Sequence, residues 1–218
     1  MPVATTISLS RPSRRKGELT AERILDVAEA LFAEYGYEGT TLRDVALRVG
    51  IRIPSLYNHF ASKDSLYAAV LERGLGPVLE VLAEFVAERS GARDSGRVVE
   101  RVVALLAQHP NLARLVQHET LSGGQRLTPM LRSWIAPAFA RAHEMVEATP
   151  GARRWEHDDI PLLVLAIFHA LVGYFAIAPF YRQLNDLDLL ADPMRERQTR
   201  VLREIVAALF PPDARSEG

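Results

Sequence analysis

Residues 39–67, GTTLRDVALRVGIRIPSLYNHFASKDSLY, constrain the fold of this 218-residue chain more than any other stretch. Thr40 or Thr41 can cap a short helix that Gly50 ends, and a turn of three to four residues then leads into a second short helix. The second helix spans Ile53–Phe60, where Pro54 is tolerated because it lies in the first turn. Two helices joined by such a glycine-containing turn predict a helix-turn-helix, the unit that places its second helix in the major groove of DNA.

Polar side chains gather on the outer side of the second helix, because Leu56 and Phe60 lie four residues apart and are predicted to face inward. Serine, asparagine and histidine can hydrogen-bond to base edges, whereas a tyrosine hydroxyl and a lysine can reach phosphates. A threonine at a helix N-terminus can offer an amide and a hydroxyl to a further phosphate. The candidate DNA contacts are Thr40, Thr41, Arg52, Ile53, Ser55, Tyr57, Asn58, His59 and Lys63.

A helix and a basic segment precede this unit. Thr20 is a good N-cap for a helix with apolar residues at helical spacing, and Gly36 can end that helix near Tyr35. Residues 1–16 contain basic side chains and no acidic ones, although the net charge of the whole chain is −1. A basic arm suits contact with phosphates, and a solvated tail explains the same charges equally well. The basic residues of this segment are Arg11, Arg14, Arg15 and Lys16.

The fold class predicted for the whole chain is all-α. Hydrophobic residues make up 48% and charged residues 24%, which is typical of a soluble globular protein, and there is no cysteine. Apolar periodicity predicts further helices near 78–89, 97–107, 111–121, 129–148, 159–178 and 194–210, and no segment alternates like a half-buried strand. Residues 74–77, Gly-Leu-Gly-Pro, predict a break. We therefore expect a flexible arm at 1–18, a DNA-binding domain at 19–73 and a helical-bundle domain at 74–218.

The most apolar stretch is Ile160–Ala178, which has no acidic residue, lysine or arginine over 19 residues. Its length approaches that of a membrane span. Pro161, His169 and Gly173 argue against a span, and burial between a core and a partner subunit explains the composition better. No secretory signal is recognised at the N-terminus, so a cytoplasmic protein is expected.

The run from Thr20 to about Val70 resembles the DNA-binding domain of the tetracycline-repressor (TetR) family of bacterial regulators. The matching segments are ILDVAEALFAEYGYEGTTLRDVALRVG and SLYNHFASKDSLYAAVL, about a third of the chain. The resemblance implies phosphate or groove contacts at Thr41, Tyr57, His59 and Lys63, and base-proximal positions at Ser55 and Asn58. Members usually carry Ser or Thr where this chain has Arg52, so the cap of the recognition helix is lost, while an arginine there can hold a phosphate or a guanine.

The resemblance also implies that the remaining two thirds form an effector-binding and dimerisation domain. In the family, the last two helices pair with those of a second copy, although an intramolecular bundle would give the same apolar stripe. The resemblance implies palindromic operator DNA and a small hydrophobic or aromatic effector as partners, and no cofactor or metal. Aromatic and imidazole side chains on apolar helices are the pocket candidates, and core packing explains each of them too. These are His118, Trp134, His143, Phe168, His169 and Tyr174, with Phe139, Phe175 and Tyr181 as weaker candidates.

Alternative functions remain open from sequence alone. A helical-bundle enzyme could use His118-Glu119 or His157-Asp158-Asp159, but neither has metal-ligand spacing and no nucleophile elbow or phosphate loop is present. A regulator without an effector, or an activator, would share the same DNA-binding unit. The sequence does not define the effector, the operator, the regulated genes, or whether one dimer or a pair of dimers binds DNA.

Overall fold

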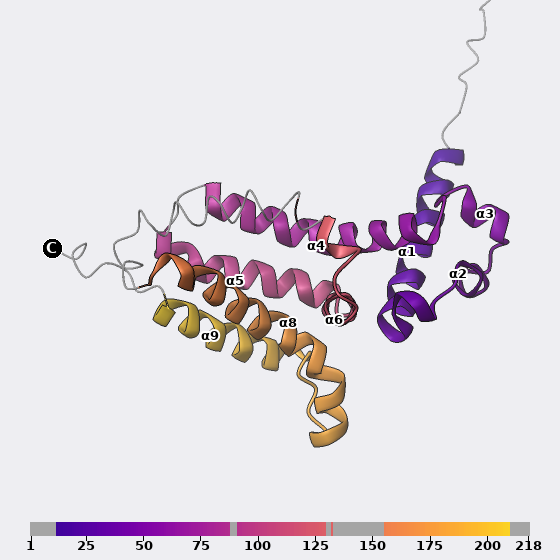
Figure 1. Cartoon of the computed structure of the whole chain (residues 1–218). Coiled ribbons are helices and arrows are strands. Elements are labelled where there is room, and N and C mark those ends of the chain that lie inside the picture. The colour runs from indigo at the N-terminus through magenta and orange to yellow at the C-terminus, as the bar shows by residue number, and fades with distance from the viewer. Residues whose placement is uncertain (1–11, 88–90, 130–131, 133–154, 210–218) are drawn as a thin grey trace, which may run out of the picture. The chain divides into compact units, whose positions relative to one another are not determined.

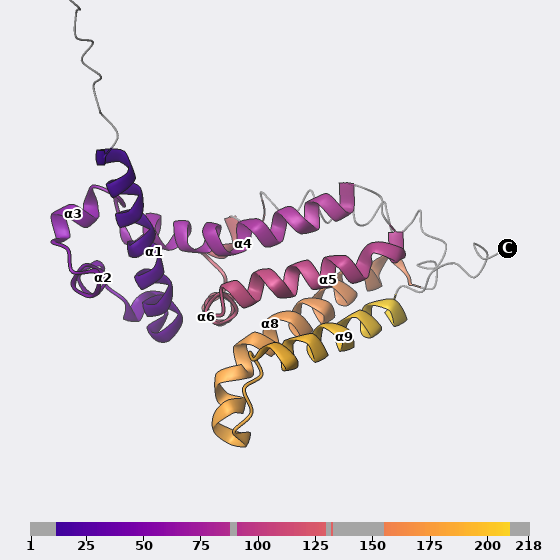
Figure 2. The ribbon, with the colours of Figure 1, turned by 180° about the vertical axis from the view of Figure 1, so that it is seen from behind.

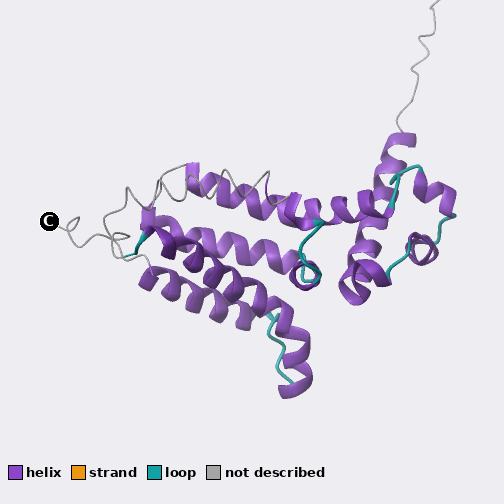
Figure 3. Ribbon diagram, in the orientation of Figure 1, coloured by secondary structure: helices purple, strands orange, loops and turns teal. Residues whose placement is uncertain are grey.

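The structure, a computed structural model, describes residues 12–87, 91–129, 132 and 155–209. The described residues form helices joined by short loops, with no strand among them, so the predicted all-α class is confirmed (Figures 1 and 3). The chain divides into two units, Met1–Val70 and Leu71–Gly218. The dividing point lies close to the predicted domain boundary at 73/74.

The first unit consists of α1 (Pro12–Gly39), α2 (Leu42–Val49), α3 (Ile53–Tyr57) and the beginning of α4 (Lys63–Ala87). Helix α1 begins eight residues before the predicted cap at Thr20. Pro12 supplies the reason, because proline at the first helical position has the required φ and loses no hydrogen bond. Arg14, Arg15 and Lys16 therefore belong to a helix rather than to the predicted flexible arm. Gly36 does interrupt α1, with φ 70° and ψ 178°, as its glycine identity predicted.

Apolar and aromatic side chains from all four helices form the core of the first unit. Leu56 is fully buried, as predicted, and holds the short helix α3 against the core of the first unit. Phe32 and Tyr67 meet edge to face with ring centroids 4.8 Å apart, which joins the middle of α1 to α4. The other buried members are Ile24, Ala28, Leu31, Ala33, Val45, Ala46, Val49, Leu66 and Val70.

Helix α4 continues through the Gly74–Pro77 segment, so the predicted break is wrong. A proline inside a helix removes one backbone hydrogen bond and costs about 3 kcal/mol. Burial of Val78, Leu79 and Val81 directly after the proline offsets that cost. Gly74 contributes as well, since a Cβ there would lie 2.7 Å from Leu112 Cδ1, and its absence lets α4 approach α6 closely.

The second unit contains the rest of α4, α5 (Gly91–Gln108), α6 (Leu112–Leu121), the 3-10 turn η2 (His157–Asp159), α8 (Ile160–Asn185) and α9 (Asp192–Leu209). Helix α5 lies alongside α9, and α6 packs against α8 (Figures 1 and 2). An ion pair at 2.7 Å between Arg203 and Glu100 joins α9 to α5. Helix α8 extends past the predicted end at Ala178 and through Pro179. The helix predicted at 129–148 falls almost entirely outside the described residues.

A buried carboxylate ties the end of α6 to the segment that follows. Glu119 is only 2% exposed, and its Oε2 accepts backbone N–H groups from Arg126 and Leu127, both at 3.2 Å. A buried charge is tolerated when hydrogen-bond donors surround it. Glu119 is therefore occupied as a structural acceptor, not placed as an acid–base group facing solvent.

Helices α8 and α9 expose many large apolar side chains in a single copy of the chain. Within α8, the segment Pro161–Asn185 is long and apolar enough to cross a membrane. An 18-residue window in this segment has a mean hydropathy of 2.2, and only 24% of that window is buried. Such an apolar face needs a cover in water, whether a protein surface or a bilayer. The most exposed members are Leu162, Leu165, Ile177, Phe180, Leu184 and Val201.

Candidate nucleic-acid interface

The start of α2 is fixed by a reciprocal cap. The Thr41 side chain accepts the Asp44 backbone N–H at 3.2 Å, and the Asp44 carboxylate accepts the Thr41 backbone N–H at 3.1 Å and the Thr41 hydroxyl at 2.5 Å. These bonds satisfy amides that a helix N-terminus otherwise leaves unpaired. The Thr41 hydroxyl lowers the pKa of the Asp44 carboxyl, and the Thr41 backbone N–H lowers it further. The prediction that Thr40 or Thr41 starts this helix is thus resolved in favour of Thr41.

The turn between α2 and α3 depends on Gly50. Its φ of 79° and ψ of 33° lie in the left-handed region, which side chains other than glycine adopt at a cost. The Gly50 and Ile51 amides donate to the Ala46 carbonyl, each at 3.0 Å, which closes α2 tightly. The chain then needs only Ile51 and Arg52 before α3 begins, and this is the short connection that a helix-turn-helix requires.

Helix α3 is short and exposes its outer face. It ends at Tyr57 rather than at Phe60, and Asn58 to Phe60 follow as a turn whose amides bond back to Pro54 and Leu56. Arg52 occupies the N-cap in extended conformation without a side-chain cap bond, as the sequence predicted. The Arg52 guanidinium, which has no capping role, projects at the exposed beginning of the helix. Its position suits a phosphate or a guanine.

Eight of the nine predicted DNA contacts are exposed or half-buried in the first unit, and we call these eight residues the recognition surface. Arg52, Tyr57, Asn58 and Thr41 are exposed, and Ile53, Ser55, His59 and Lys63 are half-buried. Thr40 differs, because it is 1% exposed and its hydroxyl contacts the Leu31 and Gly36 carbonyls at 3.1 and 2.9 Å. The prediction of a DNA contact at Thr40 is wrong, because the buried hydroxyl is directed to carbonyls of α1 rather than to solvent.

Lys63 is held by a residue that the sequence analysis did not select. Its ammonium lies over the ring of Tyr37, 4.0 Å from the centroid, and the Tyr37 hydroxyl donates to Asp64 Oδ1 at 2.7 Å. Ser62 caps α4 as predicted, since its hydroxyl accepts the Ser65 amide at 3.0 Å. No local pattern could have revealed Tyr37, because it lies 26 residues before Lys63 and meets it only through the packing of α1 against α4.

The predicted effector-pocket residues do not gather in one described cavity. Phe168 and His169 are exposed in a single copy of the chain, and His169 Nδ1 lies 2.9 Å from the Leu165 carbonyl of its own helix. Tyr174 is half-buried and its hydroxyl donates to the Leu189 carbonyl, and burial raises the pKa of Tyr174. His118 is half-buried on α6. Phe175 is buried and Tyr181 half-buried, while Trp134, Phe139 and His143 lie outside the described residues.

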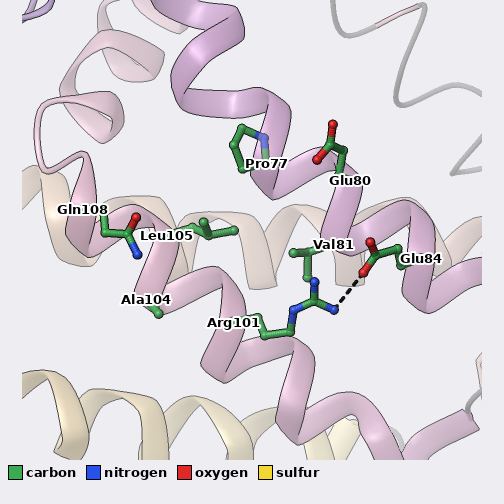
Figure 4. Close-up of a pocket in the computed structure, with 8 residues that line it drawn as sticks. All are labelled: Pro77, Glu80, Val81, Glu84, Arg101, Ala104, Leu105 and Gln108. Atoms are coloured by element: carbon green, nitrogen blue, oxygen red, sulfur yellow. Dashed lines mark ion pairs between the residues drawn. The ribbon is translucent and has the colours of Figure 1, made fainter. Parts of the chain in front are cut away.

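An open groove of about 320 Å³ lies between α4 and α5 (Figure 4). Val81 and Leu105 supply apolar surface, and an ion pair at 2.8 Å between Arg101 and Glu84 crosses it. None of the predicted pocket residues is among those that line it. The remaining lining residues are Pro77, Glu80, Ala104 and Gln108. No group of three or more potential metal ligands is found among the described residues.

Comparison with known proteins gives the same assignment for the first unit and extends it over the chain. Residues 24–70 match the family described as bacterial regulatory proteins, tetR family. The chain is 30% identical over 176 residues to the HTH-type transcriptional repressor AcnR of Corynebacterium diphtheriae, a match that covers 76% of this chain and 78% of AcnR. It is 54% identical over 46 residues to IcaR, the negative transcriptional regulator of the icaADBC biofilm operon in Staphylococcus aureus, but this match covers only 21% of this chain and 25% of IcaR.

Solved structures show that the fold is shared over most of the chain. A TetR-like transcriptional regulator from Rhodococcus sp. RHA1 superposes with a TM-score of 0.62 at 18% identity, covering 88% of this chain and 96% of that one. A transcriptional regulator from Aquifex aeolicus VF5 gives a TM-score of 0.57 at 19% identity, covering 88% and 99%. At these identities the likeness is one of fold, so it does not identify a ligand.

Proposed function

The chain belongs to the tetR family of bacterial regulatory proteins, and we propose that it is a repressor that binds a palindromic operator as a homodimer. A small hydrophobic or aromatic effector releases it from DNA. As a member of this family the chain is a DNA-binding transcriptional regulator and not an enzyme. The observation that carries the proposal is the recognition surface, because α3 exposes polar side chains while its Leu56 is buried in the core.

In the proposed complex, α3 enters the major groove and α2 crosses the DNA backbone. Asn58 and Ser55 hydrogen-bond to base edges, and Ile53 contacts thymine methyl groups. Tyr57 and Lys63 hold phosphates on either side of the groove. The basic beginning of α1 adds a further attraction for phosphates, which strengthens binding without reading sequence.

Dimerisation follows from the size of the reading unit and from the apolar surface of α8 and α9. One short helix contacts few base pairs, so a two-fold partner is needed to read a second half-site. Phe180 and Leu184 are 60% and 65% exposed in a single copy, and Val201 of α9 is 50% exposed. Exposed charged neighbours such as Arg200 and Glu204 flank the α9 residues. A partner subunit accommodates this mixture better than a bilayer does, and a cytoplasmic location suits DNA binding.

The effector binds within residues 71–218 in this proposal. The groove between α4 and α5 has the volume of a small-ligand site, and α4 itself continues into the DNA-binding unit. A ligand that favours another position of α4 needs differential affinity of only about 1–3 kcal/mol to change operator occupancy substantially.

The proposal is tested by selecting duplexes that the full-length wild type binds from a random-sequence pool, followed by affinity measurement on the selected duplex. Asn58→Ala should weaken binding at least about tenfold and relax the preference at one position of each half-site, because a base contact is worth about 1–3 kcal/mol. Gln117→Ala, which removes an exposed amide from α6, serves as the matched control and should bind like wild type. If Asn58→Ala kept the wild-type operator affinity and base preference, the assignment of α3 as the helix that contacts the bases would be wrong.

Repression and activation are separated by a reporter gene placed behind the selected operator. A repressor lowers reporter expression, and the expression returns when the effector is supplied. Raised expression in the presence of the protein would replace the repressor assignment with that of an activator.

A further inference from the structure

We propose that Tyr37 is a positioning residue for DNA binding: its ring face holds the Lys63 ammonium in the place where a phosphate receives it. This inference rests on the proposed function and adds to it a residue that does not itself touch DNA. It concerns three side chains from the end of α1 and the beginning of α4, namely Tyr37, Lys63 and Asp64.

The ring of Tyr37 is held by two aromatic neighbours, independently of Lys63. It lies parallel to Phe32 with centroids 6.1 Å apart, and it meets Tyr67 edge to face at 5.1 Å. Phe32 and Tyr67 are themselves buried at 0% and 1% exposure, so the ring rests against a rigid core. Tyr37 is only half-buried, which leaves part of its surface accessible.

Lys63 uses that accessible surface. Its ammonium lies 4.0 Å from the Tyr37 ring centroid, within the range in which a cation is attracted by the electrons of an aromatic face. The ring covers one side of the ammonium, and the N–H groups directed away from the ring can still donate to a phosphate oxygen. The contact therefore selects a position for the charge without removing its ability to bind an anion.

A lysine at this position benefits from being held. Lys63 is the first residue of α4, where the positive end of the helix dipole disfavours a cation. Its four-carbon chain also has many rotamers, and fixing them on DNA costs conformational entropy. The aromatic face lowers both costs in the free protein, because it attracts the charge and reduces the number of rotamers that must be lost on binding.

Asp64 completes the arrangement. The Tyr37 hydroxyl donates to Asp64 Oδ1 at 2.7 Å, so the carboxylate is directed to the hydroxyl edge of the ring while the ammonium occupies its face. A carboxylate next to a phosphate-binding lysine would otherwise compete with the phosphate for the ammonium. The same tyrosine thus places the cation at its ring face and the anion at its hydroxyl edge.

The amino-acid composition makes this geometry unusually easy to measure. Lysine occurs at two positions in the whole chain, 16 and 63, whereas the other 24 of the 26 basic residues are arginines. Labelling lysine alone therefore gives two sets of NMR signals, and Lys16 provides the internal reference. In the free wild-type protein the Lys63 ε-methylene protons should be shifted upfield by the ring current of Tyr37, and Tyr37→Leu should remove that shift.

The functional test measures the dependence of operator affinity on salt for full-length variants. Each phosphate contact contributes about 0.9 to the slope of log affinity against log salt. Lys63→Ala should lower the slope by about that amount, and Tyr37→Leu should lower it by more than half as much although Lys63 is still present. Tyr37→Phe, which keeps the ring, should retain most of the wild-type slope. Tyr35→Leu removes an exposed tyrosine from the same helix and should leave the slope unchanged.

The double variant Tyr37→Leu/Lys63→Ala separates positioning from a merely structural role. Positioning predicts that the double variant binds no more weakly than Lys63→Ala alone, because Tyr37 acts through Lys63. Additive losses, an unchanged slope in Tyr37→Leu, or an unshifted Lys63 signal in the wild type would each overturn the inference. Failure of wild type to bind any selected duplex would instead overturn the proposed function, and the NMR measurement would still decide whether the ring holds the ammonium.

Discussion

The two units of the chain expose opposite kinds of surface. Around α3, the first unit exposes polar side chains such as Asn58 and Arg52 over a core that includes the aromatic rings of Phe32 and Tyr67. Along α8 and α9, the second unit exposes large apolar side chains such as Leu184. Polar exposure suits a partner that is hydrated and charged, whereas apolar exposure suits a partner that excludes water. This difference is what the proposed function requires, namely one surface for DNA and another for a second copy of the chain.

The largest effect is expected when charge is placed on the apolar surface of α8. Phe180→Glu combined with Leu184→Glu should convert a dimer into monomers, raising the dimer dissociation constant at least about a hundredfold, because burying an unpaired charge costs about 3–5 kcal/mol. Sedimentation velocity measures the change. Leu121→Glu is the control, since it introduces the same charge at a residue of α6 that is 87% exposed and should leave the assembly intact.

A membrane-bound protein would behave differently in that experiment. If a bilayer covers α8, the wild type should bind neutral lipid vesicles and remain monomeric in solution. Cosedimentation of wild type with such vesicles, without self-association, would replace the dimer interpretation.

The neighbouring residues Thr40 and Thr41 have different structural roles within the first unit, one buried and one at a helix cap. Thr40→Val should destabilise the protein by about 1–3 kcal/mol, because it removes the buried hydroxyl that donates toward the Leu31 and Gly36 carbonyls. Thr41→Ala should cost about 1 kcal/mol, the usual value of an N-cap. Urea unfolding measures both losses. A larger loss for Thr41→Ala than for Thr40→Val would contradict the assigned roles.

Substitutions of Arg52 test whether this residue strengthens operator binding while lowering the free energy of unfolding. Arg52→Ser should raise the free energy of unfolding by about 0.5–1 kcal/mol, because serine can cap α3 where arginine makes no cap bond. The same change should weaken operator binding. Arg52→Ala separates the two effects, since it removes the guanidinium without adding a cap, and it should weaken binding without raising stability. Tighter binding by Arg52→Ser would mean that Arg52 makes no contact with DNA.

The smallest expected effect concerns pH. Hydrogen bonds from Thr41 hold the pKa of Asp44 below its ordinary value of 3.8. Because the folded-state pKa is the lower one, the stabilisation is present above the unfolded pKa and is lost as pH falls through the folded pKa. The difference in urea midpoint between wild type and Asp44→Asn should therefore shrink as the pH drops below about 4. If the difference in urea midpoint stayed constant with pH, protonation of Asp44 would not weaken its hydrogen bonds to Thr41.

The same contrast between units explains what the sequence could predict. In the first unit the starts of α2 and α4 follow from local hydrogen bonds of Thr41 and Ser62, and these bonds involve residues three positions apart. Local rules therefore succeed there. They fail for α1, whose start is marked by Pro12 rather than by the better N-cap residue Thr20.

In the second unit, the errors come from packing that no local pattern contains. Pro77 and Pro179 lie inside helices because buried neighbours offset the missing hydrogen bonds. His169 was predicted to line an effector pocket, yet it is exposed on α8 in a single copy of the chain. The contact between Tyr37 and Lys63 was missed in the first unit for the same reason, since it depends on how α1 packs against α4.

The central claim is that two copies of the chain present two recognition surfaces to one operator. It is tested most directly by measuring the mass of the protein bound to the selected duplex together with a hydroxyl-radical footprint of that complex. The account predicts an even number of chains on the duplex and two-fold related protected segments, with the centres of paired half-sites about one helical turn, roughly 34 Å, apart. A single bound chain, or one protected segment without a symmetry-related copy, would contradict it.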